Sequence, residues 1–315
     1  MSRILLINVD SKILNLALMK ISAYHKNKGD IVGFDITNPD IVYISCVFTQ
    51  NAEKARGIAT YYPDSEIVFG GSGIDISKKL PDDIEYLCPD YSIYPNCDYS
   101  MGYTTRGCIR SCPFCIVPKK EGFFKRWQHI REFHNPQHRK VMVLDNNVYA
   151  DRTWFFENTN YIIENNLQFN AVQGMDIRLL DEEIADRLKQ IRWFGTMHFA
   201  FDNIKDEEKV LRGIEILQNA GFDTSHISFY VLTGYNTTFE EDLYRINLLR
   251  SHNCGAFVMQ YKKTSQSKQL ARYVNRRWLY WSTTFEEYSP LRENQLKRVR
   301  AQLPEITLDT FSNIY

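Results

Sequence analysis

The sequence predicts an α/β protein in which a small Rossmann-like or flavodoxin-like domain precedes a partial, open (β/α)6 barrel. Two observations indicate this class. Short apolar runs with strand character alternate with helical patterns along most of the 315-residue chain, and such alternation is typical of parallel sheets with covered faces. Six strand–helix units follow residue 98, which suits a partial barrel better than a closed one of eight units.

Residues 1–98 are predicted to form the first domain and its linker. A helix is expected from about residue 11 to residue 28, where Gly29 can end it. Proline residues interrupt the weakly periodic linker at positions 81, 89 and 95. Strand-like runs occupy three ranges: Arg3–Val9, Asp40–Cys46 and Glu66–Gly71.

Residues 99–261 are predicted to form the barrel. Asp181 is an expected N-cap, because apolar residues follow it at helical spacing, and a further helix begins near Asp206 and stops at Gly221. Strand parity puts Phe199 outward and Tyr230 toward a polar interior. The expected strands are Tyr99–Thr105, Lys140–Asp145, Gln168–Gln173, Gly195–Asp202, His226–Leu232 and Ala256–Tyr261.

Three of the seven cysteines, Cys108, Cys112 and Cys115, stand within eight residues in the spacing C-x-x-x-C-x-x-C. An odd total argues against a complete disulfide framework. Structural zinc requires four protein ligands, whereas several thiolates on one loop are typical of iron–sulfur clusters. The loop follows a strand, at the end of a parallel barrel where active sites lie. The pattern therefore indicates an iron–sulfur site, with structural zinc or unligated thiols as the alternatives.

These three cysteines, with the aromatic Phe114 before the third, resemble the radical S-adenosylmethionine (radical SAM) superfamily, over roughly Tyr103–Tyr261. The resemblance implies a [4Fe–4S] cluster that cleaves S-adenosylmethionine reductively. The resulting 5′-deoxyadenosyl radical would abstract hydrogen from a substrate that the sequence does not identify. The resemblance also implies an external electron donor, similar to flavodoxin or ferredoxin.

The resemblance further implies a set of cofactor-binding residues. The strand end at residues 145–147 would bind the amino group of the methionine moiety, and Tyr230 lies on the strand that would contact adenine. Arg106 and Arg178 are candidates for the carboxylate by charge alone. A plain strand-end turn and a satisfied polar pair at His198 and Asp202 are the structural alternatives. The full set is Phe114, Asp145, Asn146, Asn147, Gln173, Arg178, His198, Asp202 and Tyr230; no catalytic residue is assigned.

The first domain resembles the cobalamin-binding (B12-type) domain that precedes many radical SAM barrels, through the glycine turn at Ile67–Gly73. The D-x-H-x-x-G loop is missing, and His25 is the sole histidine before the cysteine motif, so cobalamin is left open but not predicted. Residues 40–58 resemble methylthiotransferases, but only Cys46 falls near a matching cysteine position. A cobalamin-dependent methyltransferase and a methylthiotransferase-like RNA-modifying enzyme are therefore alternatives.

The net charge is zero, yet the stretch from Tyr261 to Trp281 has six basic and no acidic residues, interleaved with aromatics. It opens the expected C-terminal extension, residues 262–315. Such a segment suits a phosphate backbone with stacked bases, or alternatively a solvated helix whose aromatics enter the core. A metal-stabilised nucleic-acid-binding module is the alternative of another class. Peptide, nucleic acid and small metabolite all remain candidate substrates.

The other cysteines (Cys46, Cys88, Cys97 and Cys254) are expected to be small buried residues. The histidines at positions 129, 134 and 138 are expected at a solvated helix end, because their spacing does not suit a metal site. No apolar run approaches the 20 or so residues of a membrane span, and no signal-peptide pattern opens the chain. A cytoplasmic protein without a membrane partner is expected.

Overall fold

The computed structural model describes residues 1–288 and 294. The chain divides into two compact units, here called the first unit, residues 1–145, and the second unit, which begins at residue 146. The predicted boundaries after residues 98 and 261 stay predictions. Most of the expected C-terminal extension beyond residue 288 lies outside the described residues.

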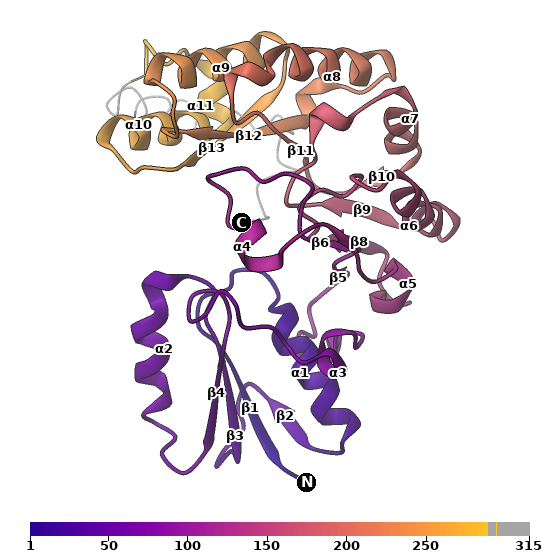
Figure 1. The fold of residues 1–315 in the computed structure, drawn as a ribbon, viewed down its shortest axis with the longest axis vertical. Helices are drawn as coiled ribbons and strands as arrows, with labels where there is room; N and C mark the ends of the chain where they lie inside the picture. Colours follow the sequence, from indigo (N-terminus) through magenta and orange to yellow (C-terminus); the bar gives the residue numbers. More distant parts are fainter. Residues whose placement is uncertain (289–293, 295–315) are drawn as a thin grey trace. The chain divides into compact units, whose positions relative to one another are not determined.

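The first unit begins with a parallel four-stranded sheet in the order β2-β1-β3-β4 (Figure 1). This order is that of flavodoxin-like open sheets. Two core clusters show that α1 packs on one face through Ile4 and Leu6, while α2 packs on the other through Leu5. The elements are β1 (Arg3–Asn8), α1 (Leu16–Asn27), β2 (Ile31–Gly33), β3 (Ile41–Ser45), α2 (Ala52–Ala59) and β4 (Glu66–Gly70).

The three predicted strands of this sheet are confirmed, and the short β2 is an addition. The first helix begins at Leu16 rather than near residue 11, because the side chain of Asn15 caps it by accepting a hydrogen bond from the Leu18 amide. Gly29 follows the helix with a positive φ of 83°, as expected for a residue that ends a helix.

The remainder of the first unit carries the cysteines. Strands β5 and β8 pair in parallel, and β6 and β7 form a short antiparallel hairpin. The segment from residue 107 to residue 116, here called the cysteine loop, lies between β6 and α4. The elements are η1 (Thr49–Asn51), α3 (Asp82–Glu85), η2 (Tyr91–Ile93), β5 (Tyr99–Gly102), β6 (Thr105–Arg106), α4 (Val117–Glu121), β7 (Lys125–Arg126), α5 (Ile130–Phe133) and β8 (Lys140–Val143).

The second unit alternates strands and helices, and its strands pair in parallel as β9 with β10 and as β11-β12-β13. An α/β class with mostly parallel sheets is therefore confirmed, and the six-unit barrel stays a prediction. The elements are α6 (Arg152–Glu164), β9 (Gln168–Ala171), η3 (Ile177–Leu179), α7 (Glu182–Gln190), β10 (Arg192–Trp193), β11 (Met197–Ala200), η4 (Ile204–Asp206), α8 (Glu207–Asn219), η5 (Thr224–His226), β12 (Ile227–Thr233), α9 (Phe239–Ser251), β13 (Gly255–Gln260), α10 (Ser265–Val274) and α11 (Arg277–Ser282).

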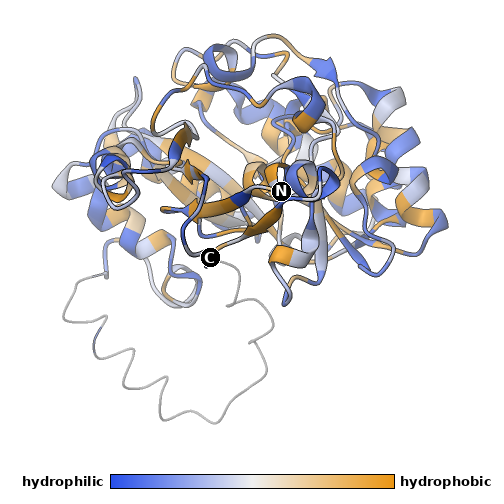
Figure 2. Ribbon diagram, turned by 90° about the horizontal axis from the view of Figure 1, so that it is seen from below, coloured by the Kyte–Doolittle hydropathy of each residue, from blue (hydrophilic) through white to orange (hydrophobic). Residues whose placement is uncertain are grey.

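The predicted strand parity is confirmed in β11 and β12. Phe199, Phe229 and Val231 are fully buried, while His198 and Tyr230, on the opposite face, keep partial exposure. Strands coloured by hydropathy are largely orange in Figure 2, whereas the helices carry mixed colours, as amphipathic cover requires. Burial of apolar side chains accounts for one face of β11 and β12. The polar residues on the other face need a different explanation.

Helix α10 packs against β13 and α11. Tyr273 and Tyr280, which the sequence allowed as stacking platforms, are instead buried at 0% and 1% exposure. The interpretation with aromatics in the core is therefore correct for these two residues. Among the described residues, no helix has both the length and the apolar character needed to cross a bilayer.

The expectation of a solvated helix end at the three histidines is wrong. His129 caps α5 by accepting from the Arg131 amide, and Nε2 of His134 lies 3.0 Å from the carbonyl oxygen of His138. All three are buried, and Nδ1 of His138 lies 3.1 Å from the hydroxyl oxygen of Ser100 in β5. The expectation of buried cysteines holds for Cys46 and Cys254, whereas Cys97 is half-buried and Cys88 is exposed.

Candidate active site

The cysteine loop keeps its three thiols partly accessible. Cys108, Cys112 and Cys115 are all half-buried. The backbone amide of Arg110 donates to Sγ of Cys108 at 3.3 Å, and the amide of Val117 donates to Sγ of Cys115 at 3.5 Å. Hydrogen bonds to the sulfur atoms are one of the ways in which a protein tunes an iron–sulfur cluster.

The base of the cysteine loop is tied together by a buried carboxylate that the sequence interpretation missed. Glu121 accepts from the Gly107 amide at 3.0 Å and lies 3.6 Å from Nε of Arg106. The Arg106 guanidinium also stacks over Tyr103, 4.0 Å from the ring centroid. Arg106 thus anchors the loop. The signal for Glu121 was its position as the one acidic residue among six basic ones between residues 103 and 127.

Gly107 is required at the first position of this loop. Its φ is +74°, and a Cβ there would lie 2.3 Å from the carbonyl oxygen of Phe123. The chain therefore leaves β6 in a conformation that only glycine adopts without strain. This close approach fixes where the cysteine loop begins.

Asp145 supports the strand that leads into the cysteine loop. Its carboxylate accepts from the amide of Thr104 at 2.7 Å and from the hydroxyl of Thr105 at 2.8 Å, and it also bonds the Thr104 hydroxyl. Burial raises the pKa of Asp145 to about 6, against the opposing effect of these hydrogen bonds. Both carboxylate oxygens are thus engaged within the first unit.

The donor set of the cysteine loop fits an iron–sulfur cluster chemically, since thiolates are its protein ligands. Among residues 1–288 and 294, however, no three His, Cys, Asp or Glu side chains lie close enough together to hold a metal ion. That finding concerns sites for a single ion, whereas each thiolate of an iron–sulfur cluster binds an iron of its own.

At the carboxyl edge of the first unit's open sheet, side chains of the chain itself satisfy one another. Asp10 accepts from the amides of Val47 at 2.7 Å and Phe48 at 3.0 Å, and from Nδ2 of Asn51 at 3.0 Å. Burial acts to raise the pKa of Asp10, but these hydrogen bonds prevail and lower it. Asn15 bonds Ser45 in the same network. Ligands of flavodoxin-like folds bind at this switch point between β1 and β3.

The glycine turn after β4 and the early histidine are likewise engaged in the first unit. A Cβ on Gly71 would lie 2.2 Å from the carbonyl oxygen of Cys46, so the turn packs directly on the end of β3. Nδ1 of His25 lies 2.8 Å from Asp30, and its Nε2 lies 3.0 Å from the hydroxyl of Tyr43. Neither ring nitrogen of His25 is left for cobalt, and the edge does not fit a cobalamin ligated by this residue.

In the second unit, a stacked pair lies on the polar face of the parallel strands. The rings of His198 and Tyr230 stack with centroids 4.6 Å apart and an interplanar angle of 6°. The Tyr230 hydroxyl donates to the carbonyl of Val172 at 3.0 Å, and a Cβ on Gly174 would lie 3.1 Å from its ring. The segment after β9 is thereby held against β11 and β12.

The ionisable groups of this face have shifted pKa values. Burial lowers the pKa of His198 to about 4, so the imidazole is neutral at pH 7. Burial raises the pKa of Asp202, which accepts from the Leu232 amide at 3.2 Å. Arg178 is held by Asp176 at 2.7 Å and Asp206 at 3.0 Å, so its charge is already balanced.

Several buried polar atoms of the second unit lack a hydrogen-bond partner among the described residues. Asn147 and Asn170 are 2% and 5% exposed, and the side-chain oxygen of each accepts no hydrogen bond. Nδ1 of His198 is also buried without a partner. Since most buried polar atoms in proteins are paired, such atoms indicate a place where water or a ligand completes the network. Sequence reasoning missed Asn170, which alternation on β9 could have identified as facing the interior.

The remaining predicted residues differ in exposure and belong to both units. Gln173 is exposed, and Phe114 and Asn146 are half-buried. Within the second unit, the fold brings His198 and Tyr230 into direct contact and places Asp202 just beyond the end of β11, where it accepts from the Leu232 amide of β12. Asp145 belongs to the first unit, where it supports the cysteine loop.

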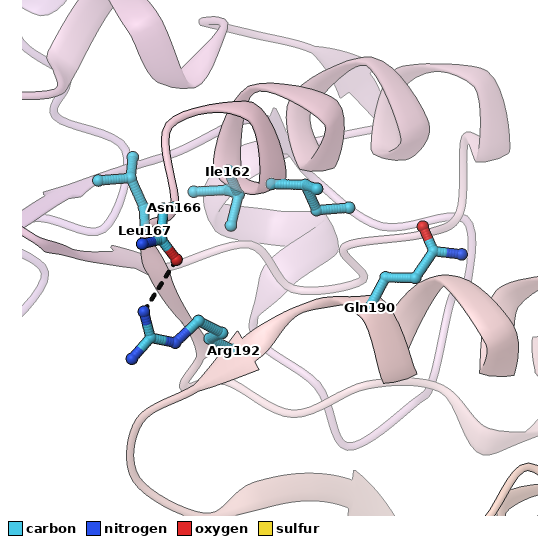
Figure 3. Close-up of a pocket in the computed structure, with 6 residues that line it drawn as sticks. Ile162, Asn166, Leu167, Gln190 and Arg192 are labelled. Atoms are coloured by element: carbon cyan, nitrogen blue, oxygen red, sulfur yellow. Dashed lines mark hydrogen bonds between the residues drawn. The ribbon is translucent and has the colours of Figure 1, made fainter.

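A shallow pocket lies at the amino ends of β9 and β10 (Figure 3). Arg192 donates to Oδ1 of Asn166 at 2.8 Å across it. The lining residues Ile162, Ile163, Leu167 and Gln190 complete it. It lies where these strands begin, whereas ligands of parallel α/β sheets bind where strands end, so we assign it no functional role.

A scan against models of known protein families finds no match to this chain, and a search of curated proteins finds none either. The chemistry of the cysteine loop and of the polar strand face therefore carries the functional argument alone.

Proposed function

We propose that the protein is a radical SAM enzyme whose iron–sulfur cluster is bound by Cys108, Cys112 and Cys115. The observation that supports this most directly is the cysteine loop itself. Three thiols in C-x-x-x-C-x-x-C spacing stay partly accessible, and two of them accept backbone amide hydrogen bonds. A predominantly structural role would favour burial of the sulfur atoms.

When bound, a [4Fe–4S] cluster on three thiolates would leave one iron for S-adenosylmethionine and supply the electron that yields a 5′-deoxyadenosyl radical. The chain's own part is positioning and exclusion of water. Asp145 holds β6, the strand from which the loop departs, and Glu121 holds Gly107, the first residue of the loop. The partial (β/α)6 barrel belongs to the same proposal, with β5, β8, β9, β11, β12 and β13 as its strands, as does an electron donor similar to flavodoxin or ferredoxin.

Within the predicted cofactor-binding residues, hydrogen bonding favours some over others. Asn147 has an acceptor oxygen without a partner, which suits the amino group of the methionine moiety, whereas Asp145 has both oxygens engaged. His198 and Tyr230 offer a neutral, stacked surface toward which the adenosyl group could be oriented. Arg178 is the weaker candidate for a carboxylate contact, because two aspartates already balance it.

Two narrower functions receive less support. A cobalamin-dependent methyltransferase needs a cofactor site in the first unit, where Asp10 and Asn15 are already satisfied by their neighbours. A second cluster of the methylthiotransferase kind would need Cys46, which is buried with Sγ 3.5 Å from Asp10.

The test is anaerobic reconstitution of the full chain with iron and sulfide, followed by S-adenosylmethionine and dithionite. We expect about four iron and four sulfide per chain and formation of 5′-deoxyadenosine. Cys108→Ala should lose both, while Cys88→Ala, at an exposed cysteine outside the loop, should retain both. Zinc without acid-labile sulfide would refute the proposal and favour a metal-stabilised binding module instead.

A further inference from the structure

The C-terminal part of the second unit has a one-sided charge distribution that the proposed function does not explain. No acidic residue occurs from Leu243 to Phe285, a stretch of 43 residues that contains eight Lys or Arg. Arg245 and Arg250 are engaged internally, by Asp242 and by the Tyr273 hydroxyl respectively. The other six basic residues lie between residues 262 and 277.

Helix α10 sorts this segment into an apolar and a basic face. Leu270 and Tyr273 are fully buried against the unit. Lys268 and Arg272, one helical turn apart, are both exposed on the opposite side. Thr264 caps the helix by accepting from the Ser267 amide, and this cap fixes the direction in which the chain enters.

The basic face continues past the start of the helix. Lys262 and Lys263 precede the cap and are exposed, and no carboxylate within the described part of the chain pairs with either. Tyr261, at the carboxyl end of β13, is 48% exposed and meets Tyr235 edge-on, with ring centroids 4.7 Å apart at 75°. The following five residues are called the basic surface below: Tyr261, Lys262, Lys263, Lys268 and Arg272.

The composition of the basic surface selects among partners. A protein interface has an apolar centre, but Leu270 and Val274 of α10 are buried, and Met259 on β13, 47% exposed, is a single apolar side chain rather than a patch. A membrane-binding helix would likewise expose apolar side chains. Lysine and arginine side chains repeated beside an accessible aromatic ring instead suit phosphates and a stacked base.

We propose that the basic surface binds a single-stranded nucleic acid, with Lys262, Lys263, Lys268 and Arg272 at the phosphates and Tyr261 stacking on a base. From the cap to Arg272, α10 rises about 12 Å, enough for several nucleotides. Because β12 and β13 end beside this surface, the bound strand would lie at the carboxyl ends of these strands, where ligands of parallel α/β sheets bind. That this nucleic acid is the substrate rests on the proposed function, whereas its binding to the basic surface does not.

The experiment measures fluorescence anisotropy of labelled 20-nucleotide RNA and DNA single strands with the full chain, before any cluster is loaded. We expect binding at 50 mM NaCl that weakens steeply by 200 mM. The double variants Lys262→Glu/Lys263→Glu and Lys268→Glu/Arg272→Glu should each lose at least about tenfold in affinity and show a smaller salt slope. Lys205→Glu/Lys209→Glu, at two exposed lysines of the same unit, is the matched charge control and should lose less than about twofold.

A second pair of variants tests stacking. Tyr261→Ala should lose about tenfold with little change in the salt slope, while Tyr261→Phe, which keeps the ring, should bind as the parent does. The inference is overturned if no strand binds at 50 mM NaCl, if the control variant weakens binding as much, or if polyglutamate binds more tightly than nucleic acid. Production of 5′-deoxyadenosine by a chain that fails these binding tests would leave the proposed function intact and remove only this inference.

Discussion

The two units differ in how completely the polar side chains near their parallel strands are hydrogen-bonded. In the first unit, Asp10 and Asn15 are fully engaged where the open sheet ends, and glycine lets the turn after β4 pack directly on β3. In the second unit, Asn147, Asn170 and His198 keep buried polar atoms without protein partners.

The difference teaches how to distinguish a structural polar network from a binding one in related α/β topologies. A buried hydrogen-bonding group without a partner costs about 1–3 kcal/mol, so a fold keeps several of them only where something else satisfies them. Nε of Arg3 and Nε1 of Trp127 in the first unit also lack a partner among the described residues, so the contrast holds between two places and not between whole units. The carboxyl edge of the first sheet, where Asp10 and Asn15 are engaged, is structural, and the polar face of the second unit is the place for a ligand.

The largest expected effect comes from placing a methyl group at equivalent turns of the two units. Gly71→Ala would put Cβ 2.2 Å from the Cys46 carbonyl at a φ of +91°, and should cost more than about 3 kcal/mol of unfolding free energy. Gly234→Ala meets only the Lys262 amide at 3.9 Å, and should cost about 1 kcal/mol from its φ of +74°. Urea unfolding followed by circular dichroism measures both, and equal losses would contradict the contrast.

The same Asn→Leu change should have opposite signs in the two units. Asn15→Leu removes the cap of α1 and the partner of Ser45, so we expect a loss of about 2 kcal/mol. Asn170→Leu removes a buried oxygen that has no partner, so we expect a gain of about 1 kcal/mol.

Thermal unfolding with and without S-adenosylmethionine extends this test. Asn170→Leu should lose part of any stabilisation by the ligand, since that oxygen is then missing from the binding face. A loss of stability as large as that of Asn15→Leu would mean that Asn170 is structural and that the second unit is no more open than the first.

The pH dependence of unfolding tests whether the Asp145 carboxyl is buried, as its role in supporting β6 requires. Because its pKa is raised from 3.8 to about 6, its stabilising contribution is complete below pH 3.8 and is lost as pH rises through 6. Asp145→Asn should therefore gain about 2 kcal/mol relative to the parent between pH 4 and pH 7.5. Chemical denaturation at the two pH values gives this difference, and a difference independent of pH would show that the carboxyl is not buried in the folded protein.

The smallest expected effect is at His198, and its dependence on pH runs in the opposite direction to that of Asp145. Its pKa is lowered from 6.5 to about 4, so its contribution is present above pH 6.5 and is lost as pH falls toward 4. His198→Phe keeps a ring against Tyr230 and should gain about 1 kcal/mol relative to the parent at pH 4.5 compared with pH 7.5, after allowance for partial solvent access. Denaturation curves at both pH values test this, and no relative gain would mean that water reaches the imidazole freely.

Much of the fold could be predicted from periodicity. The strands β1, β3, β11 and β12, and the shared polar face of His198 and Tyr230, follow from the sequence pattern, because a half-buried strand must separate its two faces. Glu121 and Asn170 could not be singled out, since their importance depends on partners, or missing partners, distant in sequence or brought close by a turn. The buried histidines near α5 were predicted wrongly for the same reason.

The sequence by itself determined the α/β class, the spacing of the three cysteines and the acid-free basic segment, because periodicity, spacing and charge are local properties of the chain. Only the tertiary structure decided that Asp145 and Arg106 support the cysteine loop, that Asp10 closes its own sheet edge, and that Tyr273 is core whereas Tyr261 is accessible. The physical reason is that hydrogen-bond satisfaction and burial are set by which segments meet in space, and local patterns do not contain that information.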